Sequence, residues 1–77
     1  MQVVLYSRPG CHLCDEARAV LVAARESTPF ELDEVDIESS DALIREFGLR
    51  IPVVTMQGRV EFECSVDRRA FEALLDS

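Results

Sequence analysis

The chain has 77 residues, of which 48% are hydrophobic and 30% are charged, a composition typical of a small globular protein and not of a disordered segment. We expect a single domain over residues 1–77, with a core limited by the short length. The formal net charge is −7, and the eight basic residues are all arginine. No basic stripe is available to neutralise a phosphate backbone, which argues against nucleic-acid binding.

Membrane insertion and export are not expected from this sequence. No apolar run approaches the roughly 20 residues needed to span a bilayer. Met1 and Gln2 lead directly into a strand pattern without a charged leader, so we expect a cytoplasmic protein with no membrane contact. Three cysteines are an odd number, which favours reactive or buried thiols over a structural disulfide framework. No marked exposed apolar segment is evident, so a monomer is expected.

The first half of the chain reads as strand, helix, strand. A β-branched run over residues 2–6 is too short for a helix and indicates a buried strand. From Leu13 to Ala24, apolar residues recur at the spacing of one helix face, which predicts a helix. Pro29 cannot continue the helical ladder, so the chain turns there and enters a second strand. Regular alternation of apolar and acidic residues marks this strand over residues 34–37.

A short second helix is expected after the second strand. Ser39 or Ser40 can cap its N-terminus, and Asp41 suits its first turn. Gly48 is expected to end it in the left-handed conformation. Its apolar side is formed by Leu43, Ile44 and Phe47.

The last third of the sequence predicts a hairpin and a final helix. Two β-rich runs, residues 51–56 and 59–62, are joined by the tight turn Gln57-Gly58. Asp67 can cap the last helix, with Val66 and Phe71 at the positions of a hydrophobic staple. Four residues of this helix are expected to face inward: Ala70, Phe71, Leu74 and Leu75. The order β-α-β-α-β-β-α predicts an α/β fold, a mixed four-stranded sheet with helices on both faces.

The motif Cys11-His12-Leu13-Cys14 lies directly after the first strand and its turn, and directly before the first helix. Two intervening residues on a first helical turn bring both sulfurs onto one face, close enough to form a disulfide. A thiol at a helix N-terminus is stabilised as a thiolate by unpaired N–H groups and the helix dipole. Such placement lowers a cysteine pKa from about 8.5 to roughly 3.5–7.5, which produces a nucleophile at neutral pH. The motif therefore predicts a redox-active pair.

This element order, together with the segment Tyr6-Ser7-Arg8-Pro9-Gly10-Cys11-His12-Leu13-Cys14, closely resembles the glutaredoxins, members of the thioredoxin fold. The resemblance implies that Cys11 is the nucleophile, with Arg8 near in sequence to assist its thiolate, and that Cys14 is the more buried resolving thiol. It also implies a cis peptide bond between Ile51 and Pro52. Pro52 would then shape a substrate groove, and the backbone of Ile51 would pair with an incoming substrate chain.

Two departures from the glutaredoxin pattern bear on the chemistry. His12-Leu13 stands where glutaredoxins usually have Pro-Tyr, and this resembles a smaller set of glutaredoxin-like proteins. Residues 62–65, Phe-Glu-Cys-Ser, stand where glutaredoxins have Gly-Gly and small acidic residues that receive glutathione. Phe and Glu there would crowd or repel a ligand that carries carboxylates, although Arg8 and Arg50 could supply positive charge. We expect no bound cofactor, and glutathione as reductant is disfavoured but left open.

Several side chains have both a functional and a structural interpretation. His12 could stabilise the Cys11 thiolate as an imidazolium or could point to solvent, and these are evenly balanced. Tyr6 is a second candidate modulator of the pair. Cys64 could be a third redox thiol or a glutathionylation site, but a small buried hydrophobic residue is the favoured interpretation. No metal site is expected, because zinc would need two more ligands, and only Cys64 and His12 offer themselves.

The leading hypothesis is a thiol–disulfide oxidoreductase involved in cell redox homeostasis, cycling a Cys11–Cys14 disulfide through a mixed disulfide on Cys11. Its partner would be a disulfide-containing protein or a low-molecular-weight thiol. The alternative is a non-catalytic adaptor that binds a partner protein at the groove beside Pro52. The two hypotheses differ in whether function requires the cysteines.

Overall fold

The computed structural model describes residues 1–76 and forms the expected alternation of strands and helices. The elements, in chain order, are β1 (Gln2–Ser7), α1 (His12–Ser27), β2 (Glu31–Asp36), a 3₁₀ turn η1 (Ile37–Ser39), α2 (Asp41–Phe47), β3 (Val53–Met56), β4 (Arg59–Glu63) and α3 (Arg68–Leu75). This confirms the order β-α-β-α-β-β-α and adds η1, which the sequence pattern did not predict. None of the helices formed by residues 1–76 is both long and apolar enough to cross a membrane.

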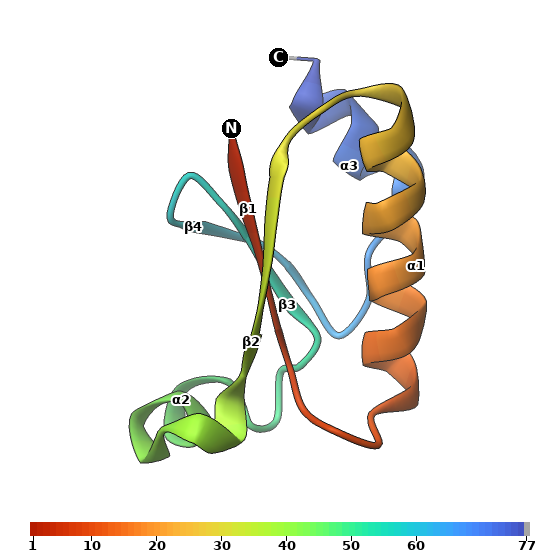
Figure 1. Cartoon of the computed structure of the whole chain (residues 1–77). Coiled ribbons are helices and arrows are strands. Elements are labelled where there is room, and N and C mark those ends of the chain that lie inside the picture. The colour runs from red at the N-terminus through yellow and green to blue at the C-terminus, as the bar shows by residue number, and fades with distance from the viewer. Residues whose placement is uncertain (77) are drawn as a thin grey trace.

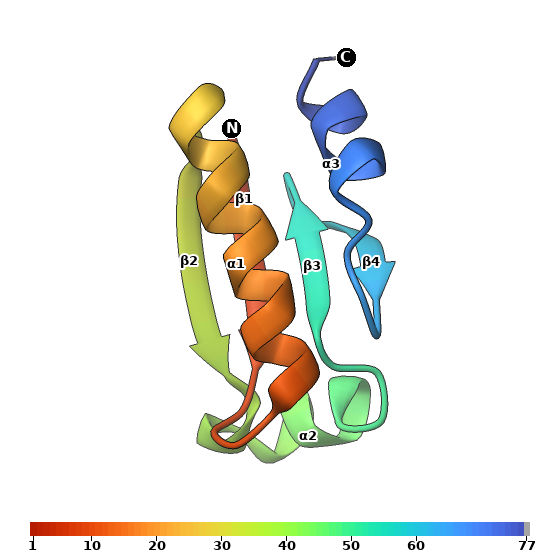
Figure 2. The same ribbon diagram turned by 90° about the vertical axis from the view of Figure 1, so that its right-hand side faces the viewer.

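The four strands form one mixed sheet in the order β2-β1-β3-β4. β1 and β2 are parallel, whereas β3 is antiparallel to both of its neighbours. Helices α1 and α3 lie on one side of the sheet, and α2 lies on the other side near one end (Figure 1). Figure 2 shows that the start of α1, the start of β3 and α2 are all at this same end. The expected mixed sheet with helices on both faces is confirmed.

Each face of the sheet has its own apolar cluster. The larger cluster joins β1 and β3 to α1 and α3, with Phe71 of α3 fully buried at its centre. The Phe71 ring centroid lies 5.5 Å from that of Phe30 and 6.2 Å from that of Phe62. The smaller cluster lies under α2, where Phe47 packs with Ile37 and the start of β3. Burial of the two faces anchors both α1 and α2 to the sheet.

Local signals at turns and helix starts were mostly read correctly. Ser40 caps α2 by accepting a hydrogen bond from the Leu43 N–H at 3.4 Å. Gln57 and Gly58 both have positive φ, 53° and 81°, as expected for a tight hairpin turn. Asp67 directly precedes α3 as predicted, but its side chain makes no capping hydrogen bond.

Three expectations about strand and helix faces were wrong. Ile37 belongs to η1 and not to β2, because the Asp36 carboxylate accepts a hydrogen bond from the Glu38 N–H at 2.9 Å and turns the chain. Ile44 is 43% exposed, because the short helix α2 presents the i, i+4 pair Leu43 and Phe47 to the smaller cluster. Ala70 is exposed, since α3 packs through Phe71 and the residues one turn later.

Gly48 was expected to be left-handed, and this was also wrong. Its φ and ψ are −54° and −35°, a right-handed helical conformation, and its N–H donates to the Ile44 carbonyl at 2.8 Å. A Cβ atom at this position would lie 2.5 Å from the Ile44 carbonyl oxygen. The glycine is therefore needed for space and not for a positive φ.

Candidate functional site

Cys11 and Cys14 form a disulfide at the N-terminus of α1. Their Cα atoms are 5.2 Å apart, within the range of about 4.4–6.8 Å usual for disulfides. Cys11 is the N-cap residue, and its sulfur accepts a hydrogen bond from the Cys14 N–H at 3.2 Å. Cys14 is fully buried, whereas Cys11 is partly exposed. Cys11 is therefore the more accessible of the two bonded cysteines.

The residues between the cysteines face solvent. The His12 side chain is 88% exposed, and its Nε2 lies 3.3 Å from the Glu16 carboxylate one turn later. This contact favours the interpretation of His12 as a helix-start residue over that of a partner for the Cys11 thiolate. Leu13 is also exposed.

The cis peptide bond between Ile51 and Pro52, implied by the glutaredoxin resemblance, is present in the structure. Because Tyr6 near the end of β1 pairs with Val53 at the start of β3, this bond lies at the disulfide end of the sheet (Figure 2). The Ile51 N–H donates to the Phe47 carbonyl at 3.1 Å. Within residues 1–76 no hydrogen bond is donated to the Ile51 carbonyl.

Tyr6 is placed away from the cysteines. Its ring centroid lies 4.7 Å from that of Phe47, under α2 on the opposite face of the sheet from α1. Side chains alternate between the two faces of a strand, so Leu5 and Ser7 face α1 while Tyr6 does not. The structure assigns Tyr6 to the core under α2.

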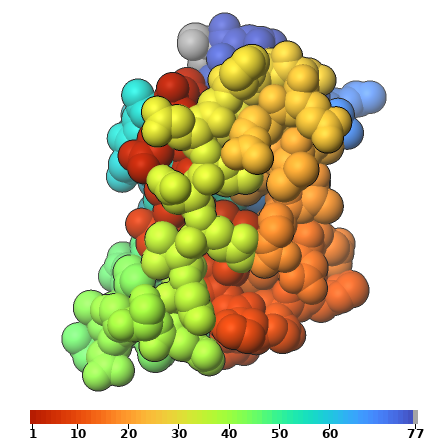
Figure 3. Space-filling model, in the orientation of Figure 1, coloured from red at the N-terminus to blue at the C-terminus, as the bar shows by residue number. Residues whose placement is uncertain are grey.

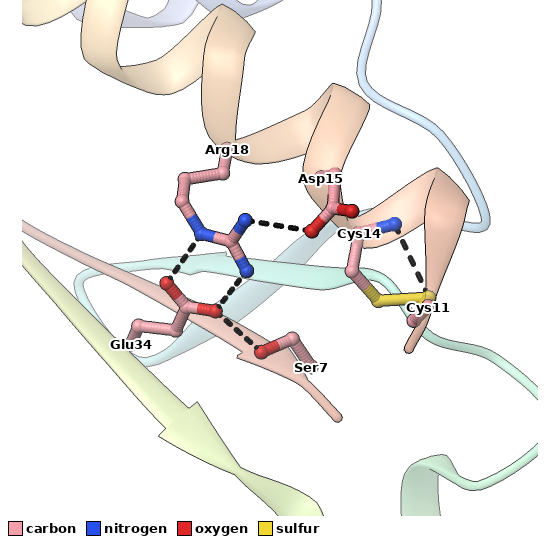
Figure 4. The surroundings of a disulfide bond; sticks show 6 residues. All are labelled: Ser7, Cys11, Cys14, Asp15, Arg18 and Glu34. Carbon is pink, nitrogen blue, oxygen red and sulfur yellow. Dashed lines mark hydrogen bonds and ion pairs between the residues drawn. A yellow bond between two sulfur atoms is a disulfide. The ribbon is translucent and has the colours of Figure 1, made fainter. Parts of the chain in front are cut away.

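A polar network that the sequence did not reveal lies beside the disulfide (Figure 4). The Arg18 guanidinium donates to both carboxylate oxygens of Glu34, with Nε 2.7 Å from Oε1, and donates to Asp15 at 2.8 Å. The buried Ser7 hydroxyl donates to Glu34 at 2.7 Å. Hydrogen bonds from Arg18 and then Ser7 lower the pKa of Glu34, against the opposing effect of burial. The hydrogen bonds that Arg18 donates to Glu34 and then to Asp15 raise the pKa of Arg18.

Sequence spacing gave no signal for this network, because its members meet only through the fold. Glu34 lies 27 residues after Ser7, and the parallel pairing of β1 with β2 brings them together. Arg18 reaches the same point from the second turn of α1. The network therefore connects α1, just after the cysteines, to the two strands beneath it.

A shallow hollow of about 380 Å³ lies beside this network. It is found where the loop before α1, the first turns of α1 and the end of β2 meet, on the face drawn in Figure 3. Arg8 lines the hollow and is exposed, and it forms no hydrogen bond or ion pair with the described part of the chain. Arg8 lies in the loop that leads to Cys11, and its proposed assistance to the Cys11 thiolate stays a prediction. The lining residues are Ser7, Arg8, Pro9, Gly10, Asp15, Arg18, Glu34 and Asp36.

Arg50, which could supply local positive charge for a glutathione-type ligand, is instead paired within the chain. Its Nε and Nη2 donate to the two carboxylate oxygens of Glu63 at 2.8 and 3.0 Å. Its Nη1 lies 3.4 Å from the Glu46 carboxylate, and its guanidinium lies 5.2 Å from the Phe47 ring centroid. The hydrogen bonds between Arg50 and Glu63 raise the pKa of the arginine and lower that of the glutamate.

Cys64 is exposed, which corrects the expectation of a small buried hydrophobic residue. The chain leaves β4 at Glu63, and Cys64 follows the strand with a positive φ of 69°, which is uncommon for a residue other than glycine. Its N–H donates to the carbonyls of Arg50 and Pro52, at 3.0 and 2.9 Å. Among residues 1–76, no group of three or more His, Cys, Asp or Glu side chains is placed to hold a metal ion.

Comparison with known proteins identifies the family. Residues 2–76 match the family described as glutaredoxin-like domain (DUF836). The chain belongs to the glutaredoxin-like family. An X-ray structure of protein XcR50 from X. campestris resembles this glutaredoxin-like chain with a TM-score of 0.81 and 35% identity, covering 96% of this chain and 95% of the other. The solution structure of protein Ne2328 from Nitrosomonas europaea has a TM-score of 0.80 and 29% identity, covering 95% and 88%.

More distant similarity extends to thioredoxin itself. A mutant thioredoxin from Halobacterium salinarum has a TM-score of 0.67 at 21% identity, which shows that the fold is thioredoxin-like. Among curated sequences, the uncharacterized protein Rv0508 of Mycobacterium tuberculosis is 30% identical, covering 94% of this chain and 79% of its own length. The glutaredoxin-like chain thus combines a thioredoxin-like fold with a disulfide at the start of α1.

Proposed function

We propose that this glutaredoxin-like chain is a thiol–disulfide oxidoreductase in which Cys11 attacks and Cys14 resolves. The observation that carries the proposal is the unequal burial of two bonded sulfurs at one helix N-terminus. Cys14 is fully buried and Cys11 is partly exposed, so only one sulfur is open to an external disulfide. Membership of the glutaredoxin-like family and the thioredoxin-like fold support the same chemistry.

The proposed cycle begins with both cysteines reduced. The Cys11 thiolate attacks one sulfur of a substrate disulfide, forming a mixed disulfide and releasing the other substrate sulfur as a thiolate, which takes up a proton. The Cys14 thiol then loses its proton and attacks the Cys11 sulfur. This step releases the second substrate thiol and forms the Cys11–Cys14 disulfide. The substrate gains two electrons and the protein loses two.

The N-terminus of α1 provides stabilisation for the attacking thiolate. The Cys14 N–H points at the Cys11 sulfur at 3.2 Å in the disulfide, and the same N–H would donate to a thiolate at that position. The positive end of the helix dipole adds to this effect. Arg8, exposed and unpaired within residues 1–76, provides a further positive charge in the loop that leads to Cys11.

The segment before β3 provides a surface for the substrate chain. The buried Pro52 and the free carbonyl of Ile51 lie at the same end of the sheet as the disulfide. This carbonyl can accept a hydrogen bond from a peptide N–H next to the substrate cysteine. A disulfide-containing protein is therefore the proposed substrate, because it can react at the Cys11 sulfur and also hydrogen-bond to the Ile51 carbonyl.

A trapping experiment in a Cys64→Ser background tests the assignment. The reduced chain carrying Cys14→Ser is mixed with bis(2-hydroxyethyl) disulfide and followed by mass spectrometry. A single mercaptoethanol adduct should accumulate on Cys11 because no second thiol can resolve it. The chain with both Cys11 and Cys14 should instead lose two thiols and retain no adduct.

The matched control is Cys11→Ser in the same background, which leaves Cys14 as the sole thiol. Its adduct should form far more slowly, because the Cys14 sulfur is buried. Equal rates for the Cys11→Ser and Cys14→Ser chains would contradict the assigned roles. A partner that binds the chain equally well when both cysteines are serine would instead favour the non-catalytic adaptor.

A further inference from the structure

Arg50 and Glu63 form a bidentate ion pair at the end of the sheet nearest the disulfide. Arg50 lies just before the cis Ile51–Pro52 bond, and Glu63 is the last residue of β4, paired in register with Val53 at the start of β3. The Cys64 N–H, one residue later, donates to the Arg50 and Pro52 carbonyls. Backbone and side-chain contacts therefore join the end of β4 to residues 50–52, which border the proposed substrate groove.

The Arg50 guanidinium is engaged on all of its nitrogens. Nε and Nη2 bind the two oxygens of Glu63, and Nη1 donates to the Glu46 carbonyl at 3.1 Å as well as facing its carboxylate. Two carboxylates thus face one guanidinium, and the local charge is negative. The Arg50 and Glu63 side chains remain 35% and 43% exposed, so the pair lies at the surface where a ligand can reach it.

The parallel N–H groups of a guanidinium are the protein donors best matched to a carboxylate. A substrate carboxylate that approached this wall of the groove would need the same donors that Glu63 already occupies. A neutral peptide segment has no such requirement, because it can pair with the free Ile51 carbonyl. The Arg50–Glu63 ion pair therefore disfavours binding of a carboxylate-bearing substrate and leaves binding of a neutral peptide segment unaffected.

We propose that Glu63 is a specificity-determining residue that occupies Arg50 as an internal carboxylate, and so directs the site away from carboxylate-bearing disulfides such as oxidised glutathione. This inference rests on the proposed function, because it assumes exchange at Cys11. It differs from crowding or simple repulsion by Glu63, since it requires Arg50. Removing the glutamate charge frees a cation that a substrate carboxylate can bind.

The test compares two disulfides in single-turnover reactions of the reduced chain, all in the Cys64→Ser background. Oxidised glutathione carries carboxylates, whereas bis(2-hydroxyethyl) disulfide is neutral. The readout is the ratio of their second-order rate constants, measured from the loss of free thiols on quenching with an alkylating agent. A general change in the reactivity of Cys11 alters both rate constants and cancels in this ratio.

Glu63→Gln should raise the ratio of glutathione rate to neutral rate by about threefold to fivefold, the size of an exposed charge interaction. In the double variant Arg50→Gln with Glu63→Gln, the gain should disappear, because no cation is released. Glu72→Gln, which removes one negative charge from the remote pair with Arg68 on α3, is the matched control and should leave the ratio unchanged.

Each other outcome has a definite meaning. An unchanged ratio in Glu63→Gln would overturn the inference while leaving the proposed function intact, provided the neutral disulfide still reacts at Cys11. A gain that persists in the double variant would also overturn it, because repulsion by Glu63 alone would then suffice. Failure of the neutral disulfide to react at Cys11 in any variant would overturn the proposed function itself.

Discussion

Arg18 on α1 and Glu34 on β2 are joined by two hydrogen bonds directly beside the disulfide (Figure 4). Arg18 follows Cys14 by one helical turn, and Glu34 also accepts a hydrogen bond from Ser7 at the end of β1. The helix that carries the cysteines is thereby tied to both strands that precede and follow it. Loss of this connection should lower the free energy of unfolding.

We predict that Glu34→Gln lowers the free energy of unfolding at about pH 7 by roughly 0.5–1 kcal/mol, a small value because the Glu34 side chain is 36% exposed. The direction in which this stabilisation changes with pH follows from the lowered pKa of Glu34 in the folded protein. A carboxylate with a depressed folded pKa stabilises the protein above its unfolded pKa, and this stabilisation is lost as pH falls through the folded pKa. Urea denaturation of the wild-type chain and of Glu34→Gln at several pH values measures the difference in the free energy of unfolding.

The difference between the wild-type chain and Glu34→Gln should therefore shrink as the solution is acidified below about pH 4.3, the ordinary glutamate pKa. Glu72→Gln, which affects only an exposed i, i+4 pair on α3, should lose at most about 0.5 kcal/mol at neutral pH. A Glu34→Gln effect of constant size from neutral to acid pH would show that the ion pair is not its cause.

Gly48→Ala should destabilise the chain even though Gly48 has an ordinary helical φ. The new Cβ would meet the Ile44 carbonyl oxygen at 2.5 Å, and that oxygen already accepts the Gly48 N–H. The backbone at the end of α2 must shift, at a cost of about 1–3 kcal/mol, typical of overpacking. A urea denaturation curve with unchanged slope and a lower midpoint is expected. Alanine stabilises a helix where its Cβ meets no other atom. A stabilised Gly48→Ala variant would therefore contradict the close approach between residue 48 and the Ile44 carbonyl oxygen.

The fold was largely readable from the sequence because its signals are local. Hydrophobic periodicity marked α1, Pro29 marked its end, and the turn Gln57-Gly58 marked the hairpin, as the structure confirms. The errors at Ile44 and Ala70 have a common cause. Helical periodicity defines a stripe of residues, but the neighbouring elements decide which edge of that stripe is covered.

Some features of the candidate site are local in sequence, and others form only when the chain folds. The cysteine pair and its helix position are adjacent in sequence, so they could be predicted from spacing. Arg50 and Glu63 are 13 residues apart, and they meet only because β3 and β4 pair with Val53 opposite Glu63. Cys64 was expected to be buried but is exposed, because β4 ends one residue before it, and no local sequence pattern marks that end.

The contrast between two helix caps provides a further prediction. Ser40→Ala should cost about 1 kcal/mol, because the Ser40 hydroxyl accepts the Leu43 N–H at the start of α2. Asp67→Ala should cost clearly less, since Asp67 makes no side-chain capping bond to α3. Chemical denaturation of the two variants side by side gives the comparison. Equal losses would indicate that Asp67 acts through the helix dipole to the same extent as a hydrogen-bonded cap.

The three thiols should differ sharply in their reactivity toward a maleimide. In the oxidised chain only Cys64 is free and exposed, so one adduct is expected without unfolding. In the reduced chain, Cys11 should react quickly at neutral pH as a partly exposed thiol at a helix N-terminus, whereas Cys14 should react far more slowly because it is fully buried.

Time-resolved mass spectrometry with peptide mapping assigns each adduct to its cysteine, and Cys64→Ser identifies the signal of the exposed thiol. Raising the pH from about 6 to about 9 should accelerate the reaction of Cys11 less than that of Cys64, because a helix N-terminus favours the Cys11 thiolate already at lower pH. If Cys11 and Cys64 showed the same pH dependence, the N-terminus of α1 would contribute little to the reactivity of Cys11. Equal pH dependence would also exclude stabilisation of the Cys11 thiolate by Arg8, whereas a weaker pH dependence of Cys11 that rises to that of Cys64 in Arg8→Gln would assign the stabilisation to Arg8.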